Sequence, residues 1–375
     1  MIFSCDRASL YEAVGTVQKA VAAHSSIPVL EGILIRTDKN RIVLTGNNLE
    51  IGIECILEAS VDENGSIAVN SKLFGEIIGK FSGDIVTFNC TDDANVNLKC
   101  GNSKFKITCI APDDFPELQK NPNNDFYCVS MKQKQLRELI RHTYYATSIS
   151  SPNIVLSGCF FEAENGKASM VGVDGYRLAY RKLEGENITY DSKNGETSAK
   201  TIIPAKSLTE LTKVTEDTDD EIKIFASQKN VRFEFSNVTF VCRSIEGDFI
   251  DYNKIIPEEN ATIIKVNARE LLYAVERASL IITNDVGKSP IVLNIEDREI
   301  NIDCETSAGH VKELIPVDMQ GENVKIGFNN RFLLDALKAV DSDEITMSFN
   351  GGMKPCLITP VKGDAYKYLV LPLKL

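Results

Sequence analysis

The feature that most constrains the fold is a unit of about 125 to 135 residues that the chain repeats three times. Each copy opens with a short strand and an amphipathic helix, in which Leu10, Leu136 and Leu271 occupy the same place. Apolar residues follow each leucine at the third and fourth positions, which is typical of one buried helix face. Three α+β domains that share this order by coincidence are the less favoured alternative. Three like domains are therefore expected.

The later part of each unit predicts a second helix among strands. Asn70 and Asn329 suit the N-cap of such a helix, and Pro204 suits a first helical turn. Opening helices are expected within 3–14, 129–140 and 266–275, and second helices at 70–78, 204–211 and 329–337. Strands are expected at 27–35, 84–89, 104–110, 152–161, 221–226, 231–242, 290–295, 344–349 and 368–371, with a turn at 173–177. Each unit is thus predicted to be α+β, with two helices packed on antiparallel sheets.

Domain limits follow from two similar exits from the repeated units. Asp114–Leu118 ends the first unit and Asp248–Tyr252 ends the second. Polar linkers rich in turn-forming residues follow at Asn121–Asp125 and Pro257–Ala261. Because 375 residues exceed one ordinary core, several domains are needed. We expect domains at residues 1–120, 121–257 and 258–375.

Composition and motifs exclude several classes of protein. No long apolar run or secretion leader is present, which predicts a cytoplasmic protein without membrane contact. Ten cysteines without a CxxC pair indicate reduced, buried thiols rather than disulfides or zinc. The chain has three histidines and no GxSxG, HExxH or glycine-rich phosphate loop. No acid–base constellation can be assembled, so we expect no catalysis, no metal and no cofactor.

Repetition also suggests a ring. Similar units joined head to tail leave two complementary ends, and a heterologous contact between such ends closes a ring if the rotation permits. Two chains would supply six units and twelve helices. If helices about 10 Å apart line the middle, their axes lie on a circle of roughly 38 Å diameter and leave roughly 28 Å of opening, enough for hydrated duplex DNA. The chain is thus expected to form half of a closed ring.

Charge distribution is consistent with DNA inside such a hole. The net charge is −12, yet the six expected helical segments together carry +7, which leaves −19 on the remaining residues. Positive helices fit sequence-independent phosphate contacts with double-stranded DNA, although lysine and arginine also simply solvate helix faces. No recognition-helix motif is present, which argues against base readout. A protein-interaction scaffold that never encloses DNA is the alternative.

Five segments carry a resemblance to a known family: Ile27–Leu30, Leu44–Glu50, Val173–Ala179, Gly327–Asn329 and Leu369–Leu375. In order and spacing the chain resembles the bacterial β sliding clamps, the β subunits of DNA polymerase III, over its whole length. The resemblance implies a polymerase processivity factor that closes as a head-to-tail homodimer around DNA. It also implies a clamp loader, the DNA polymerase III alpha subunit and other polymerases or repair proteins as partners, bound through short peptides.

The same resemblance implies three sets of site residues. The partner-peptide pocket between the second and third domains would comprise Leu156, Val173, Gly175, Tyr176, Arg177, Leu178, Ile250, Lys254, Ile255, Asn329, Phe332, Met353, Pro355, Leu369, Val370, Leu371, Pro372, Leu373, Lys374 and Leu375. The DNA-contacting residues would be His24, Lys72, Lys80, Lys132, Lys134, Arg137, Arg141, Ser148, Asn153, Lys206, Lys265, Arg269, Arg331 and Lys338. The subunit contacts would be Lys72, Phe74, Lys104 and Lys106 against Ile281, Ile282, Glu305 and Glu313. In the pocket, apolar walls would bury a ligand's leucine or phenylalanine, while Arg177 and Lys254 would pair with its polar atoms.

Overall fold

The computed structural model describes residues 1–92, 95–118, 120, 127–148, 150–193, 195–227, 229–282 and 289–375. The expected linker Asn121–Asp125 lies outside the described residues. The chain forms two compact units that divide the middle repeat between them. The first unit comprises Met1–Lys134, Asn187–Ala199 and Lys206–Ser244, and the second comprises Gln135–Glu186, Lys200–Ala205 and Ile245–Leu375.

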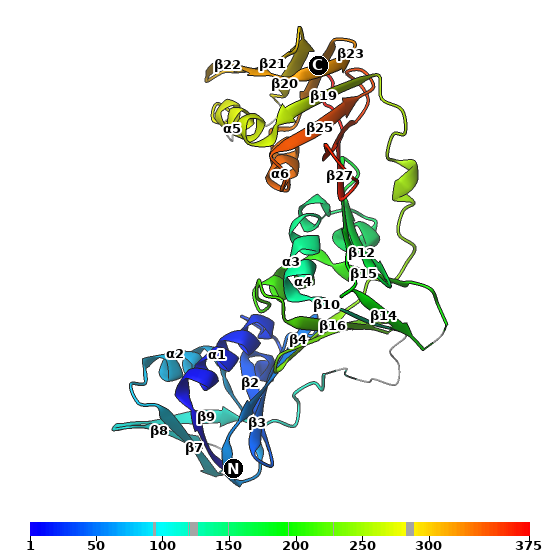
Figure 1. The fold of residues 1–375 in the computed structure, drawn as a ribbon. Coiled ribbons are helices and arrows are strands. Elements are labelled where there is room, and N and C mark those ends of the chain that lie inside the picture. The colour runs from blue at the N-terminus through cyan, green and yellow to red at the C-terminus, as the bar shows by residue number, and fades with distance from the viewer. Residues whose placement is uncertain are drawn as a thin grey trace. The chain divides into compact units, whose positions relative to one another are not determined.

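In the described part of the first unit, fourteen antiparallel strands form one continuous sheet (Figure 1). Their spatial order is β14 (Thr189–Ser192), β10 (Tyr127–Lys132), β16 (Glu221–Ala226), β17 (Asn230–Phe235), β18 (Val238–Arg243), β4 (Ile51–Glu58), β3 (Arg41–Asn47), β2 (Gly32–Asp38), β6 (Ser66–Asn70), β9 (Ser103–Ile110), β8 (Asn95–Cys100), β7 (Ile85–Asp92), β1 (Ile2–Asp6) and β5 (Ser60–Glu63). The sheet crosses from the middle repeat to the first where β18 pairs with β4, with Cys242 opposite Ile51. We call this crossing the first junction.

The described part of the second unit contains one sheet of nine strands and one of four. The larger sheet has the order β15 (Ala199–Pro204), β11 (Gly158–Glu164), β12 (Lys167–Val173), β13 (Arg177–Glu184), β27 (Tyr366–Val370), β26 (Cys356–Pro360), β25 (Glu344–Phe349), β19 (Thr262–Asn267) and β23 (Asp318–Gly321). The smaller sheet has the order β22 (Gly309–Pro316), β21 (Glu299–Thr306), β20 (Ile291–Glu296) and β24 (Val324–Phe328). At the second junction, β13 pairs with β27 and Arg177 lies opposite Val370.

Each repeat contributes two α-helices, as predicted. They are α1 (Arg7–Val17), α2 (Ser71–Lys80), α3 (Gln133–Arg141), α4 (Ala205–Thr212), α5 (Ala268–Ser279) and α6 (Asn330–Lys338). The N-caps are confirmed, because Asn70 Oδ1 accepts from Leu73 N at 3.0 Å and Asn329 Oδ1 accepts from Arg331 N at 2.9 Å. The expected place of Pro204 is wrong, because it is the last residue of β15 and precedes α4.

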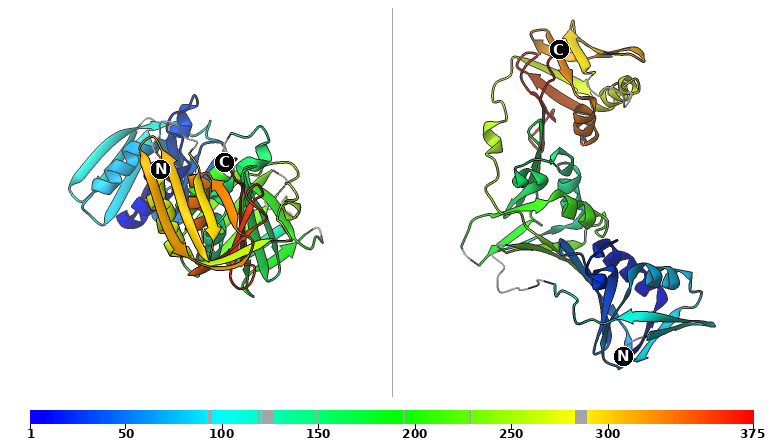
Figure 2. Two further views of the ribbon diagram at one scale, coloured as in Figure 1. Left: turned by 90° about the horizontal axis from the view of Figure 1, so that it is seen from above. Right: turned by 180° about the vertical axis from the view of Figure 1, so that it is seen from behind.

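The helices bury their apolar faces against the sheets. In the third repeat, Leu271 and Val275 of α5 and Leu333 of α6 are fully buried in a cluster that includes residues of both sheets of the second unit. Figure 2 shows α5 beside the strands β20 to β22 of the smaller sheet when the ribbon is seen from behind. Leu10, Leu136 and Leu271 are all buried, so the leucine that marks each opening helix is a core residue.

Equivalent strands show how the three repeats correspond. Each repeat contains two three-stranded antiparallel meanders. The first meanders are β2–β3–β4, β11–β12–β13 and β20–β21–β22, and the second are β7–β8–β9, β16–β17–β18 and β25–β26–β27. These pairings make β4, β13 and β22 equivalent to one another, and they do the same for β9, β18 and β27.

Two strand predictions were too long at their start. Pro28–Glu31 and Ile154–Ser157 form the 3-10 turns η2 and η5, and the strands begin only at Gly32 and Gly158. Pro28 lies in the first turn of η2, where its fixed φ suits a helical turn. Further 3-10 turns in the described residues are η1 (Gln18–Ala20), η4 (Tyr144–Ala146) and η6 (Tyr252–Lys254). The run 231–242 is a hairpin, β17 and β18, rather than one strand.

Eight of the ten cysteines are buried, as predicted. Burial raises the pKa of the Cys5, Cys159 and Cys242 thiols to about 12, which keeps them protonated and unreactive. No helix in the described residues combines the length and apolarity needed to cross a bilayer.

Candidate functional site

The turn between β12 and β13 positions the first candidate residues. Asp174 Oδ1 accepts hydrogen bonds from the backbone N–H groups of Tyr176 at 2.9 Å and Arg177 at 3.0 Å. Gly175 has a φ of 90°, a left-handed conformation that glycine adopts without steric cost. This loop therefore fixes the backbone positions from which the side chains of Tyr176 and Arg177 project.

The side chain of Arg177 is engaged within the protein. Its Nε donates to Asp174 Oδ2 at 2.9 Å, and its terminal nitrogens donate to Asp335 of α6 and to the carbonyl oxygen of Tyr145. The guanidinium carbon lies 4.5 Å from the centre of the Phe332 ring. Since only 11% of the side chain is exposed, Arg177 joins the middle repeat to α6, and a peptide would have to compete for its donors.

An exposed aromatic pair borders this arginine. The rings of Tyr176 and Phe332 stack with centroids 6.0 Å apart and an interplanar angle of 24°. Tyr176 is 63% exposed, whereas Phe332 is partly buried against the core of the third repeat. The pair presents a flat apolar wall on which an apolar or aromatic side chain can pack.

An apolar cluster at the second junction contains six of the expected pocket residues. Its buried part is Val171, Val173, Leu178, Leu357 and Leu369. Partly buried residues packed against it are Leu156, Phe160, Tyr180, Phe249, Ile250, Tyr252, Ile256 and Leu371. The structure therefore brings Leu156, Val173, Leu178, Ile250, Leu369 and Leu371 together.

The C-terminal residues are fixed to the second unit by backbone contacts. Leu371 N donates to Tyr176 O at 2.9 Å, and Leu373 N donates to Gly327 O at 2.8 Å. A Cβ on residue 327 would lie 2.5 Å from Leu375 Cδ2, so the tail passes close to β24 at this glycine. We call the tail Leu371–Leu375, which includes Pro372 and Lys374, the strap.

Other expected pocket residues lie outside the apolar cluster. Met353 and Ile255 are 69% and 40% exposed, and Lys254 is paired with Asp251 at 2.8 Å. Pro355 precedes β26, and the Asn329 side chain caps α6 rather than facing a ligand.

Sequence analysis missed the aromatic residues that support the cluster. Phe160 stacks on Phe249 with centroids 5.1 Å apart, and Tyr180 stacks on Tyr252 at 5.8 Å. Phe249 belongs to the exit segment that resembles the one carrying Phe115; Phe115 is buried and Phe249 is partly buried against the cluster. Comparison of the exits would have identified Phe249 as a residue that packs on the core.

A buried polar chain connects α3 to the third repeat. Arg141 lies 3.0 Å from His142 Nε2, and His142 Nδ1 lies 2.7 Å from Tyr368 Oη. A guanidinium can only donate, so Nε2 accepts and Nδ1 carries the proton that is donated to Tyr368. Tyr368 in turn donates to Ala339 O at 3.2 Å. Burial, then the charges of Arg181 and Arg141, lower the pKa of His142 to about 4.

The lowered pKa of His142 predicts that the protein loses stability in mild acid. The folded pKa lies below the ordinary value of 6.5, so the unfolded chain binds the proton first and stability falls as pH drops from about 6.5 to about 4. Between about pH 7.5 and 5.5, wild type is expected to lose about 1 kcal/mol more unfolding free energy than His142→Gln. Denaturant unfolding at both pH values measures this. His24→Gln, at an exposed histidine, is the control, and equal losses in wild type and His142→Gln would contradict the assignment.

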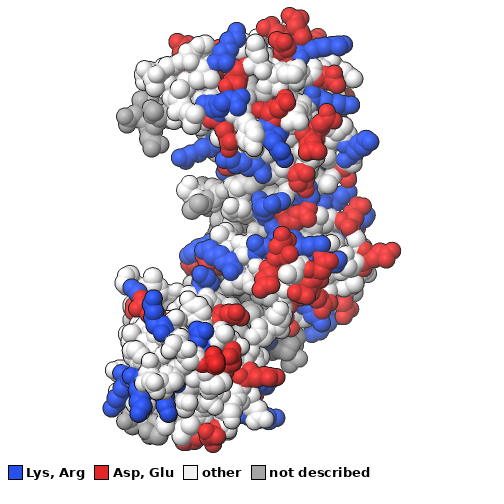
Figure 3. Space-filling model, turned by 60° about the vertical axis from the view of Figure 1, so that its left-hand side comes forward, with Lys and Arg blue, Asp and Glu red and all other residues white. Residues whose placement is uncertain are grey.

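The residues expected to contact DNA are largely accessible. Of the fourteen side chains, eleven are exposed, and Lys132, Arg137 and Ser148 are half-buried. Several lysines are paired with acids: Lys132 and Lys134 with Asp219, Lys206 with Glu50, and Lys338 with Glu276. Figure 3 shows basic and acidic side chains interspersed over the face in view. Residue 149, in the expected loop 148–153, lies outside the described residues.

Two of these residues lie in strands and not in the expected helical segments. Lys265 lies within β19. Its neighbours Ile264 and Val266 are buried in the core that α5 and α6 share. Because side chains alternate across a strand, Lys265 points from the sheet face opposite those helices. Lys132 is also a strand residue, the last of β10.

The expected subunit contacts need one correction. Phe74 has no exposed surface and packs edge-on against Phe88 with centroids 6.4 Å apart, so it cannot touch a partner. Lys72, Lys104, Lys106 and Glu305 are exposed, and Ile281 and Ile282 are partly buried against the core of the third repeat. Glu313 is held by Arg277 through hydrogen bonds of 2.8 and 2.7 Å, which lower the pKa of its carboxyl.

Comparison with known proteins gives the same family along the whole chain. Family models described as the N-terminal, central and C-terminal domains of the DNA polymerase III beta subunit match residues 1–119, 130–251 and 253–374. The beta sliding clamp of Staphylococcus epidermidis is 31% identical over 384 residues, covering 100% of this chain and 99% of the relative. The beta sliding clamp of Staphylococcus aureus is 30% identical with the same coverage.

Solved structures agree with this result. The DNA polymerase sliding clamp from Bacillus subtilis superposes with a TM-score of 0.94 at 29% identity, covering 100% of this chain and 99% of that chain. A putative DNA polymerase III beta subunit from Eubacterium rectale superposes with a TM-score of 0.92 at 31% identity and covers both chains completely.

Proposed function

Because the chain belongs to the DNA polymerase III β-subunit family, the β sliding clamps, we propose that it closes as a homodimeric ring around duplex DNA and tethers polymerases to it. A clamp of this family is a non-catalytic subunit. We place its domains at residues 1–120, 121–257 and 258–375. The proposed partners are a clamp loader, the DNA polymerase III alpha subunit and other polymerases or repair proteins that carry short binding peptides.

The observation that carries this proposal begins at the two internal junctions. At the first, Phe240 of β18 lies opposite Ile53 of β4. At the second, Tyr368 of β27 lies opposite Ala179 of β13. All four side chains are fully buried. At each junction, the last strand of a first meander therefore pairs with the last strand of a second meander, and an aromatic residue is buried between them.

The ends of the chain carry the same two strand types without their partners. Among described residues, β22 pairs only with β21, and β9 pairs with β8 and, through Cys109 and Ile110 alone, with β6. The residue of β9 equivalent to Phe240 and Tyr368 is Phe105, which is 43% exposed. Pairing β9 with β22 of a second chain would place Phe105 opposite Val311 of the partner subunit. Such head-to-tail contacts close a ring of two chains.

The second junction supports the peptide pocket. The apolar cluster and the stacked Tyr176–Phe332 pair offer apolar and aromatic surface of the kind that binds a leucine or phenylalanine side chain. The strap formed by Leu371–Leu375 adds a partly buried leucine to the same cluster. A short peptide would thus gain most of its affinity from one or two apolar anchors.

Whether the protein encircles DNA can be tested by comparing circular with linear plasmid. The protein is loaded onto nicked circular plasmid with a clamp loader and ATP, and the plasmid is then linearised. A ring slides off the free ends, so we expect nearly complete loss of bound protein after cutting and retention on the uncut circle. An interaction scaffold or an ordinary DNA-binding protein keeps the same occupancy on both forms, and that outcome would overturn the proposal.

A further inference from the structure

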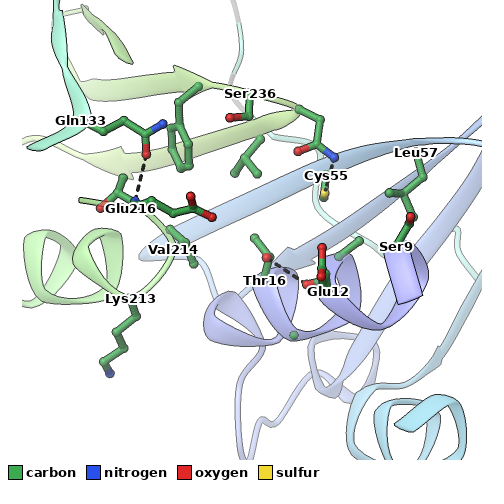
Figure 4. Close-up of a pocket in the computed structure, with 16 residues that line it drawn as sticks. Ser9, Glu12, Thr16, Cys55, Leu57, Gln133, Lys213, Val214, Glu216 and Ser236 are labelled. Atoms are coloured by element: carbon green, nitrogen blue, oxygen red, sulfur yellow. Dashed lines mark hydrogen bonds between the residues drawn. The ribbon is translucent and has the colours of Figure 1, made fainter. Parts of the chain in front are cut away.

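A cavity of about 480 Å³ lies within the first unit, beside the first junction (Figure 4). Its walls come from α1, β4, the start of α3, residues 213–216 and the β17–β18 hairpin. Two carboxylates line it, Glu12 of α1 and Glu216, and Figure 4 shows them on different sides. The volume is that of a small-ligand site.

The cavity exists because two residues of the junction are small. Cys55 of β4 lies opposite Val238 of β18, and both line the cavity. The equivalent pair at the second junction is Arg181 of β13 opposite Tyr366 of β27. A further pair of backbone bonds supports this equivalence: Ile56 N to Asn237 O at 3.0 Å, and Lys182 N to Ala365 O at 2.7 Å.

At the second junction, a guanidinium fills the corresponding space. Arg181 has 7% of its side chain exposed and binds Glu138 of α3 and Asp341. Its guanidinium carbon lies 5.7 Å from the centre of the Tyr366 ring. Carboxylates and an aromatic face are the usual partners of a buried arginine.

The first junction keeps a carboxylate but has no arginine. Glu12 follows Leu10 by two residues, as Glu138 follows Leu136, so the two glutamates are equivalent. No ion pair joins Glu12 or Glu216 to a cation within the described residues, and Lys213, which also lines the cavity, pairs with Glu210 at 2.7 Å. We propose that this cavity binds a guanidinium group between Glu12 and Glu216, in the space that Arg181 fills at the second junction.

The group can arrive on a small free molecule or on an arginine side chain of a peptide, and two probes distinguish these sources. Agmatine represents the free cation and N-acetyl-arginine amide the peptide residue. A site for peptide arginines binds both probes, whereas a site for small cations binds agmatine alone. N-acetyl-citrulline amide, which has nearly the same shape and no charge, is the matched inactive probe.

Binding is measured on the full chain by methyl NMR, with labels on Ala13, Val214 and Val238, which line the cavity. We expect saturable shifts of these signals with a Kd at or below about 10 mM, and none with citrulline amide. Glu12→Gln combined with Glu216→Gln should weaken binding at least tenfold. Glu76→Gln, at an exposed glutamate of α2 that does not line the cavity, should leave it unchanged.

A substitution that fills the cavity tests where the guanidinium binds. Cys55→Arg places the missing guanidinium on β4 and should abolish binding of both probes. Cys55→Met, which occupies the space without a charge, should also abolish it and serves if the arginine variant does not fold. Failure of both guanidinium probes to bind wild type, or unchanged binding to the double glutamine variant, would overturn the proposal. These measurements use free protein and are independent of ring closure.

Discussion

Phe105→Arg is expected to convert the protein from a dimer to a monomer in solution. Light scattering should give about twice the chain mass of 41.5 kDa for wild type and about one chain mass for the variant. The reason is that Phe105 is the counterpart of two aromatic residues that are fully buried at the internal junctions, and a desolvated, unpaired charge there costs several kcal/mol.

Two companion variants define the interface. Ile281→Ala with Ile282→Ala should also give monomers, because these residues lie beside the turn that joins β21 to β22, where Thr306 Oγ1 at the end of β21 donates to Ile281 O at 3.0 Å. Ile85→Arg is the matched control, because Ile85 is 56% exposed and lies on β7, away from both unpaired edges. A dimeric Phe105→Arg protein would show that the ring, if formed, closes elsewhere.

Deletion of Leu371–Leu375 should reduce affinity for a partner peptide by about 100-fold or more, which corresponds to about 2.7 kcal/mol. Leu371 belongs to the apolar cluster, and its N–H holds the Tyr176 carbonyl, so the deletion removes a wall and loosens the turn that presents Tyr176. Titration calorimetry with a peptide bearing leucine and phenylalanine measures the loss.

The deletion needs evidence that the fold survives. The thermal unfolding midpoint should fall by only a few degrees, because the deleted residues follow the end of β27 and leave its pairing intact. Lys362→Ala, at an exposed position between β26 and β27 that is not one of the expected pocket residues, should bind the peptide like wild type. Unaltered affinity in the deletion variant would exclude the second junction as the peptide site.

Sequence patterns predicted the features that depend on neighbouring residues. The six helices, the caps Asn70 and Asn329 and the turn Val173–Arg177 follow from spacing, side-chain chemistry and glycine content over a few positions. The errors occurred where local patterns are ambiguous. Apolar β-branched residues in η2 and η5 look like strand residues, and they form a 3-10 turn because proline or a capping asparagine starts it.

Features that depend on distant residues were not predictable in this way. Phe74 and Leu73 are adjacent on α2, and only packing against Phe88 decides that Phe74 is the buried one. The ion pairs of Arg177 join residues up to 158 positions apart. The cavity beside α1 likewise arises from Cys55 and Val238, whose pairing follows from the register between two repeats.

The continuous sheets have a consequence for how the molecule holds together. The boundaries of the sequence repeats differ from the boundaries of the compact units, because each compact unit takes strands from more than one repeat. Removing the last repeat would strip β27 from β13 and leave a long bare edge on what remains, which invites aggregation. Local opening and melting should therefore follow the hydrogen-bonded sheets and not the repeats, so that neighbouring repeats lose their order together.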